Sequence, residues 1–136
     1  MKGVLTMNGT EVEFVDSSGS EWELGLSGEA RALEALAGCG VELQGRRTGR
    51  RLSVKDWRVI AAPDGSEPFI GPLIRHGSNL VIEDRNTKGL IVLEPKSAAD
   101  MADVVGDMVM VMGFVVGPQV IRVVAWQVVL EQQLSP

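Results

Sequence analysis

Short stretches in which apolar and polar residues alternate recur along the chain, and turn-forming residues separate them. Alternation with a period of two is typical of a β-strand that buries one face. The pattern predicts strands over residues 3–7, 11–15 and 21–26. Asn8-Gly9 is a strong signal for a two-residue hairpin, and 16–19 is a second turn. The chain therefore opens with three meandering strands.

A short helix and two further strands are predicted next. Residues 30–37 are rich in Ala and Leu, Ser27 is placed as the N-cap, and Gly38 is placed to end the helix in a left-handed conformation. Strands are predicted over 41–44 and 52–55. Three strands, a helix and a two-stranded hairpin make up one unit.

The same unit occurs twice. Shifted by 68 positions, the chain aligns with itself, and one extra residue then enters the second copy. The matching pairs are Gly3/Gly71, Leu5/Leu73, Gly9/Gly77, Asp16/Asp84, Gly38/Gly106, Val41/Val109, Gly45/Gly113, Gly49/Gly117, Val54/Val123, Trp57/Trp126 and Val59/Val128. We interpret this as a duplication, with a first domain over 1–62, a linker over 63–69 and a second domain over 70–132.

The second copy carries its own helix signals. Ser97 and Asp100 have the spacing of a capping box, and Gly106 is the expected stop. We expect the extra residue in the turn 117–119 or in a bulge just beyond it.

The order of elements resembles the OB-fold, a five-stranded barrel, over the whole length of each copy. The glycine after the fourth strand (Gly45, Gly113) and the Val-x-x-Trp that ends at Trp57 and Trp126 are similar to those of bacterial OB domains. The expected fold is mostly β, with two five-stranded OB-like barrels in tandem and a short helix between strands three and four of each. An SH3-like barrel is the main alternative, although it usually lacks that helix. The resemblance concerns a fold and implies no function.

Composition argues against catalysis. The 136 residues contain one cysteine and one histidine, which excludes an internal disulfide and makes His-based chemistry improbable. Cys39 is expected to be a small, partly buried residue and His76 a turn residue that tolerates an unusual backbone angle. The carboxylates fall singly on alternating strands, and no phosphate-binding glycine loop is present. We expect no enzyme activity, no catalytic residues, no metal and no cofactor.

The chain also lacks an apolar run long enough for a membrane span or a signal peptide. We therefore expect a cytoplasmic protein with no membrane association.

A basic hairpin is the sharpest polar feature. It comprises Arg46, Arg47, Arg50 and Arg51, extended by Lys55 and Arg58. Four guanidiniums at a hairpin tip can clamp phosphates, and OB domains grip oligonucleotides with this loop. However, the chain has no tyrosine, and its net charge of -5 repels nucleic acid at long range. A solvated tip, an acidic protein partner and a nucleic acid all stay open.

Comparison of the copies predicts an apolar outer face on the second barrel. With a constant offset, apolar residues replace Glu13, Glu23, Gly25, Glu42, Gln44 and Arg46 of the first barrel; they are Val81, Ile91, Leu93, Met110, Met112 and Phe114. The interior of that barrel is expected to hold Leu80, Ile82, Leu90, Val92, Val109 and Val111. Monomers rarely leave so large an apolar patch in water. Either the first copy or another chain covers it.

We therefore expect a non-enzymatic interaction or scaffolding protein that self-associates through the second barrel, as a homo-oligomer or with a protein partner. The alternative is a single-stranded nucleic-acid-binding protein that uses the arginine-rich hairpin.

Overall fold

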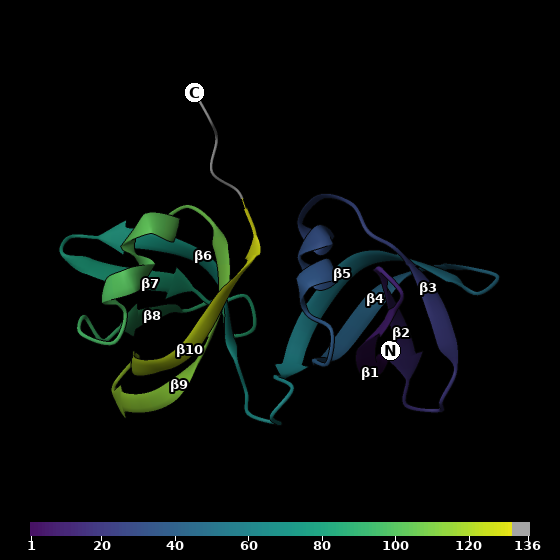
Figure 1. Ribbon diagram of the computed structural model, residues 1–136, viewed down its shortest axis with the longest axis horizontal. Coiled ribbons are helices and arrows are strands. Elements are labelled where there is room, and N and C mark those ends of the chain that lie inside the picture. Colours follow the sequence, from purple (N-terminus) through teal and green to yellow (C-terminus); the bar gives the residue numbers. More distant parts are fainter. Residues whose placement is uncertain (132–136) are drawn as a thin grey trace. The chain divides into compact units, whose positions relative to one another are not determined.

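The computed structural model describes residues 1–131, which form two compact units, the first ending at Glu67 and the second beginning at Pro68. Figure 1 shows that each unit is a closed β-barrel with a short helix of its own. We call them barrel 1 and barrel 2. The predicted end of the second domain, residue 132, lies outside the described residues. Within residues 1–131, no helix is both long and apolar enough to cross a membrane.

Barrel 1 closes in the strand order β1-β2-β3-β5-β4. Its elements are β1 (Lys2–Asn8), β2 (Glu11–Asp16), β3 (Glu21–Gly25), the 3-10 helix η1 (Gly28–Ala35), β4 (Gly40–Thr48) and β5 (Arg51–Ala61). The β3–β5 pair is parallel, and the other pairs are antiparallel.

Barrel 2 repeats this arrangement in the order β10-β8-β7-β6-β9. Its elements are β6 (Phe69–His76), β7 (Asn79–Glu83), β8 (Leu90–Leu93), the 3-10 helix η2 (Ala99–Val104), β9 (Met108–Gly117) and β10 (Val120–Leu130). The β8–β10 pair is again the parallel one. Two mostly β barrels in tandem, each with a helix between its third and fourth strands, confirm the predicted fold class.

The helix of barrel 1 is a 3-10 helix, which matches the spacing of its buried side chains. Ala30, Leu33 and Leu36 are buried and lie three residues apart, and a 3-10 helix has three residues per turn. Ser27 is the N-cap, as predicted, in an extended conformation, but its side chain makes no capping hydrogen bond. Gly38 has the predicted left-handed φ, 90°, but the helix ends earlier than predicted, at Ala35 with Leu36 as its C-cap.

The predicted capping box of barrel 2 is wrong. The N-cap of η2 is Ala98, and it makes no side-chain capping bond. Ser97 instead joins two elements, because its Oγ donates to the Glu94 carbonyl (3.0 Å) and accepts from the Val123 amide (2.9 Å). Asp100 accepts a hydrogen bond from Nε1 of Trp126 at 3.4 Å. Tertiary contacts thus take both side chains away from the helix end.

The first hairpin turn lies one residue later than the sequence predicts. Asn8 pairs with Glu11, so the two-residue loop is Gly9-Thr10, with Gly9 at a φ of 64°. A glycine at the first loop position is typical of a type II′ hairpin turn. His76 likewise ends β6, and the positive φ belongs to the next residue, Gly77.

The fourth and fifth strands are much longer than predicted, because Gly45 and Gly113 lie within the fourth strands. A Cβ on Gly45 would meet the Ser53 carbonyl oxygen at 2.0 Å, and one on Gly113 would meet that of Arg122 at the same distance. Each glycine pairs with the residue just before a bulge on the fifth strand, and the register shifts by one residue at that bulge. Glycine is needed where a bulge bends the strand and two backbones approach closely.

The strand register repeats from one barrel to the other, as the alignment of the two copies predicts. Leu43 pairs with Trp57, and Val111 pairs with Trp126, at offsets of 68 and 69. The extra residue of the second hairpin is Val116, because Val115 pairs with Ile121 and Gly117 with Val120. This bulge comes just before the turn, whereas the sequence predicted it in the turn or just beyond the turn.

The third strand departs from the constant offset. Phe14 pairs with Trp22, whereas Ile82, its equivalent, pairs with Ile91. The offset at β8 is therefore already 69. A slip of one residue turns every side chain of a strand to the other face.

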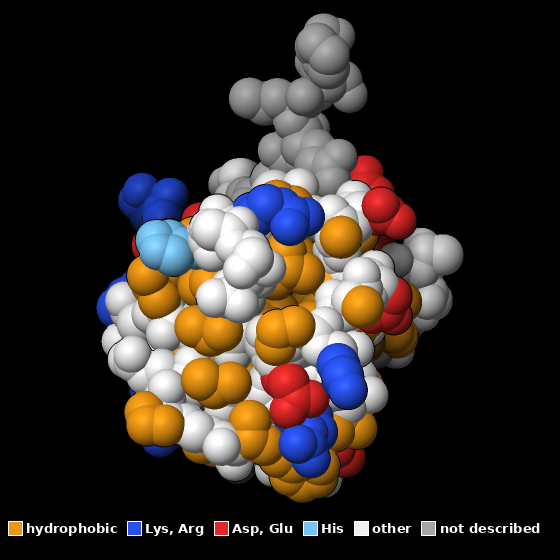
Figure 2. All heavy atoms as spheres, turned by 90° about the vertical axis from the view of Figure 1, so that its left-hand side faces the viewer, with side chains coloured by type: hydrophobic (Ala, Val, Ile, Leu, Met, Phe, Trp, Pro, Cys, Tyr) orange, Lys and Arg blue, Asp and Glu red, His pale blue; other side chains and the backbone are white. Residues whose placement is uncertain are grey.

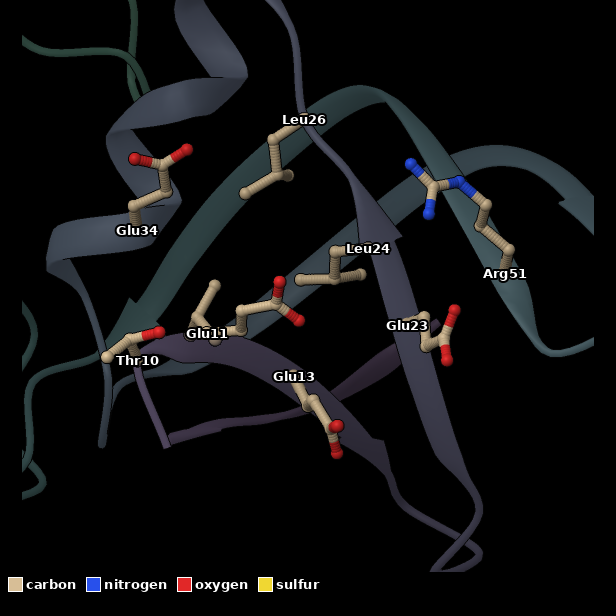
Figure 3. Close-up of a pocket in the computed structure, with 9 residues that line it drawn as sticks. Thr10, Glu11, Glu13, Glu23, Leu24, Leu26, Glu34 and Arg51 are labelled. Carbon is tan, nitrogen blue, oxygen red and sulfur yellow. The ribbon is translucent and has the colours of Figure 1, made fainter. Parts of the chain in front are cut away.

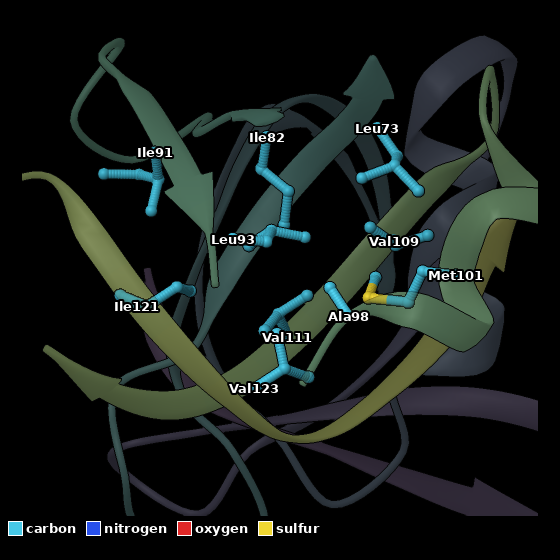
Figure 4. Packing of buried hydrophobic residues seen from close by; sticks show 10 residues of the cluster. All are labelled: Leu73, Ile82, Ile91, Leu93, Ala98, Met101, Val109, Val111, Ile121 and Val123. Atoms are coloured by element: carbon cyan, nitrogen blue, oxygen red, sulfur yellow. The ribbon is translucent and has the colours of Figure 1, made fainter. Parts of the chain in front are cut away.

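The core of barrel 2 reflects that slip. Ile91 and Leu93 lie in its buried cluster, so their predicted outward placement is wrong. Leu90 is exposed and Val92 only half-buried, although both were expected inside. The cluster, drawn in Figure 4, comprises Leu73, Ile82, Ile91, Leu93, Ala98, Met101, Val109, Val111, Ile121 and Val123.

Candidate interaction surfaces

The predicted basic hairpin is the tip of the β4–β5 hairpin, which projects beyond the rest of barrel 1 (Figure 1). All four of its arginines are exposed, and we call them the arginine hairpin: Arg46, Arg47, Arg50 and Arg51. Thr48 pairs with Arg51, so the two-residue loop is Gly49-Arg50. The pairing places Arg46 and Arg51 on one face of the hairpin, while Arg47, opposite the buried Leu52, lies on the other.

Arg47 covers the only half-buried tryptophan of barrel 1. Its guanidinium carbon lies 5.5 Å from the centroid of the Trp22 ring, a cation–π contact. The Trp22 Nε1 donates to Oδ2 of Asp16 at 3.0 Å. Both the face and the polar edge of this indole therefore have intramolecular partners.

Asp16 is held by a dense set of donors. The Ser18 hydroxyl donates to Oδ1 at 2.6 Å, and the Ser18 and Ser20 amides donate to the same oxygen. Chiefly through the Ser18 side chain and then Trp22, these bonds lower the pKa of Asp16 to about 2. The carboxylate is thus charged at neutral pH and anchors the β2–β3 turn beneath Trp22.

The other two predicted basic residues lie away from the tip. Lys55 is the bulge residue of β5, and Arg58 is paired with Glu42. At about 3.3 Å per residue, Arg58 lies roughly 25 Å along the strand from the loop. The structure brings the four arginines together but leaves Arg58 outside the group.

A hollow of about 440 Å³ lies beside the arginine hairpin, between β2, β3, β5 and η1. Figure 3 shows its polar side chains, which are Thr10, Glu11, Glu13, Glu23, Glu34 and Arg51. Four of them are carboxylates, and Arg51 is the only cation among the lining residues. Within residues 1–131, no three acidic, His or Cys side chains are arranged to hold a metal ion.

Two of these carboxylates are directly opposed. Glu13 and Glu23 face each other across the β2–β3 pair, an arrangement that is normally destabilising. The side chain of Asn8 donates to Glu13 at 2.7 Å, and Glu23 is paired with Arg51 in the β3–β5 register. The β2–β3 face of barrel 1 is therefore acidic, with one cation at its edge.

The predicted apolar face of barrel 2 is rearranged. Ile91 and Leu93 belong to the core, Val81 and Met110 are buried, and Met112 is half-buried. Phe114 is the one large exposed side chain of the predicted set, at 66% exposure.

Phe114 belongs to an exposed apolar cluster that the sequence analysis missed. Val115 is 72% and Val124 63% exposed, and Val116 is also exposed. We call Phe114, Val115, Val116 and Val124 the apolar hairpin, since they surround the tip of the β9–β10 hairpin. The signal was in the repeat: Val115 and Val124 stand where barrel 1 has Arg47 and Lys55.

One edge of this hairpin has no neighbouring strand in the part of the chain that is described. β6 pairs with β9 only from Met108 to Val111, and beyond that point β9 pairs only with β10. The open segment, 112–117, contains no charged residue. Exposed apolar edges of this kind readily pair with another chain.

The single charged side chain of this hairpin is already paired. Both Nε and a terminal nitrogen of Arg122 donate to the Glu94 carboxylate at 3.1–3.2 Å, and this contact raises the pKa of Arg122. Figure 2 shows one side of barrel 2, where hydrophobic side chains are numerous and charged ones are scattered among them.

Cys39 and His76 have the surroundings of structural residues. Cys39 is buried, and burial raises the pKa of its thiol. His76 is exposed at the end of β6, opposite Asn79. Cys39 is not among the residues that line the hollow of barrel 1.

Comparison of the chain with protein-family models, with curated proteins and with solved structures found no match.

Proposed function

We propose that the chain is a non-enzymatic interaction or scaffolding protein, built of two OB-like barrels, that self-associates through the apolar hairpin of barrel 2. The observation that carries the proposal is the apolar edge of β9. Phe114, Val115 and Val116 are exposed on it, and Val124 is exposed on β10 beside it.

A second copy of the chain is the occupant that suits this edge. A strand pairs with an identical strand antiparallel across a two-fold axis, which closes the assembly at a dimer. Pairing along 112–116 would satisfy the open backbone groups and bury apolar side chains at the same time. Natural proteins usually protect such an edge with charges, and this one carries none.

The energetics allow a dimer. Burying four side chains of this size contributes about 6–12 kcal/mol before costs. Association costs on the order of 4–15 kcal/mol, and the added backbone hydrogen bonds contribute about 0.5–1.5 kcal/mol each. The favourable contributions are of the same size as the cost of association, so a dimer is energetically feasible.

The OB-like assignment rests on topology. Each barrel is closed by a parallel pair of its third and fifth strands, with a helix before the fourth strand. Oligonucleotide binding is the second candidate function, and only the arginine hairpin favours it. The acidic β2–β3 face and the engaged Trp22 disfavour it.

The test is sedimentation velocity on the wild type and on Phe114→Glu with Val124→Glu. The wild type should sediment as a dimer at tens of micromolar, and the variant as a folded monomer because charges on an open edge block pairing.

Val4→Glu with Met7→Glu is the matched control, since Val4 and Met7 are exposed apolar residues of barrel 1. That control should remain a dimer. A wild type that is monomeric at these concentrations, or a control that dissociates as fully as the hairpin variant, would overturn the proposal.

A further inference from the structure

We propose that the arginine hairpin of barrel 1 is a docking site for an acidic segment of a protein partner. This surface is separate from the apolar hairpin, and the inference does not rest on self-association.

None of the four arginines is engaged by a carboxylate of the described chain, although Arg47 contacts the Trp22 ring. Among residues 1–131, no ion pair engages Arg46, Arg47, Arg50 or Arg51, in contrast to Arg122 of the equivalent hairpin, which is paired with Glu94. Four exposed guanidiniums within one hairpin tip repel one another. Carboxylates relieve that repulsion, and a guanidinium binds a carboxylate through two parallel hydrogen bonds.

The shape of the site favours a short segment. The hairpin projects from the barrel (Figure 1), and its cations lie on both faces, with Arg46 and Arg51 on one and Arg47 on the other. Arg51 also lies over the backbone of Gly25, where a Cβ would come within 3.3 Å of its Nε. A segment that crosses the tip can reach cations on either face.

The neighbouring surface excludes an extended polyphosphate. A nucleic-acid strand that continued from the hairpin over the β2–β3 face would place phosphates beside Glu11, Glu13 and Glu23, which line the hollow together with Arg51. Residues 1–62 carry eight basic and nine acidic side chains, so the barrel as a whole provides no attraction. Nucleic-acid affinity depends mainly on the number of phosphates neutralised, and here that number is limited to the tip.

The stacking platform that single strands require is also missing. Phe14 and Trp57 are buried, and Trp22 is engaged by Arg47 and Asp16. Since stacking on aromatic side chains supplies much of the affinity for single strands, the site offers guanidiniums without a surface for bases.

Fluorescence anisotropy at low salt tests the proposal with two probes of similar charge, a fluorescein-labelled decaglutamate and a labelled decathymidylate. The wild-type protein should bind the decaglutamate more tightly. Arg46→Ala with Arg50→Ala should weaken that binding about tenfold or more, because two charge-assisted contacts are lost. The Phe114→Glu, Val124→Glu background provides the same readout on a chain that cannot self-associate.

Arg31→Ala with Arg75→Ala is the control of equal charge, since both arginines are exposed elsewhere on the chain. It should reduce affinity only slightly. Tighter binding of decathymidylate would establish a nucleic-acid site and overturn the proposal. Equal losses in the two double variants, or no decaglutamate binding at low salt, would overturn it as well.

Discussion

The β4–β5 hairpin of barrel 1 and the β9–β10 hairpin of barrel 2 occupy the same place in the same topology but have opposite surface chemistry. Arg46, Arg47 and Lys55 of the first correspond to Phe114, Val115 and Val124 of the second. The backbone features are shared, including the close-approach glycines and the bulges opposite them. The two barrels thus share the bends that close them and differ in the side chains that face outward.

The β2–β3 face shows the same exchange. Glu13 and Glu23 oppose each other in barrel 1, and Val81 and Val92 oppose each other at the equivalent position in barrel 2. Arg51 at the edge of that face is replaced by Val120. A barrel tolerates either set because the core lies on the other side of each strand, so outer faces can change function without changing the fold.

The largest expected loss of stability comes from substituting the β8 residues that lie in the core. Leu93→Glu should unfold barrel 2, with a loss above about 4 kcal/mol, because it places an unpaired charge in a fully buried position. Leu90→Glu should change stability by no more than about 0.5 kcal/mol, since Leu90 is exposed. Chemical denaturation with far-ultraviolet circular dichroism measures both. Equal losses would contradict the register of β7 and β8.

The two equivalent tryptophans should contribute differently to the free energy of unfolding. Trp57 is 5% exposed, so Trp57→Ala should cost about 3–5 kcal/mol of unfolding free energy. Trp126 packs only partly against its core, and Trp126→Ala should cost about half as much. Urea titrations of the two variants measure the difference. A loss below about 1 kcal/mol at Trp57 would show that it does not anchor the barrel.

Asp16 should make the stability of barrel 1 depend on acid pH. Its pKa is lowered from 3.8 to about 2 in the fold, mainly by the Ser18 hydroxyl, so its contribution is complete above about pH 4 and is lost as pH falls through about 2. Asp16→Asn should therefore be less stable than the wild type at pH 6, and the gap should close toward pH 2. Ser18→Ala should raise the pKa of Asp16, measured by carbon-detected NMR titration. A gap that does not change with pH would contradict this assignment.

The smallest expected effect comes from removing the charges of the two opposed carboxylates. Glu13→Gln with Glu23→Gln should raise the unfolding free energy by about 0.2–1 kcal/mol, because a like-charge cross-strand pair is relieved. It should also increase decathymidylate binding more than decaglutamate binding, since the face no longer repels phosphates. A variant with no gain for the oligonucleotide would show that the acidic face does not select the ligand.

The barrels could be predicted from the sequence because turn glycines and alternating strands are local signals. The third strand of barrel 2 could not be placed, since no identity at the constant offset lies within it; between Asp84 and Gly106 the two copies match only at Ala30/Ala98, beyond that strand. The segment between β7 and β8 is one residue longer than its counterpart and the segment around η2 is correspondingly shorter, so the change cancels before Gly106. A run such as Leu90–Leu93 is apolar on both faces and does not reveal its own register.

The candidate surfaces were only partly predictable for a related reason. The arginine hairpin could be identified because charged residues at a turn are exposed in any register. Of the apolar hairpin, only Phe114 was predicted from the sequence. Val115 and Val124 look like ordinary strand residues until the strand is known to continue beyond the barrel. Their exposure depends on the lengths of β9 and β10, which tertiary pairing sets.

The most direct test of the account exchanges the chemistry of one hairpin for that of the other. Phe114→Arg, Val115→Arg and Val124→Lys give barrel 2 the residues of barrel 1 at the equivalent positions. Sedimentation velocity at tens of micromolar should show a wild-type dimer and a folded monomeric variant. A variant that remains dimeric, or a wild type that is already monomeric, would contradict the claim that the apolar hairpin is the self-association surface.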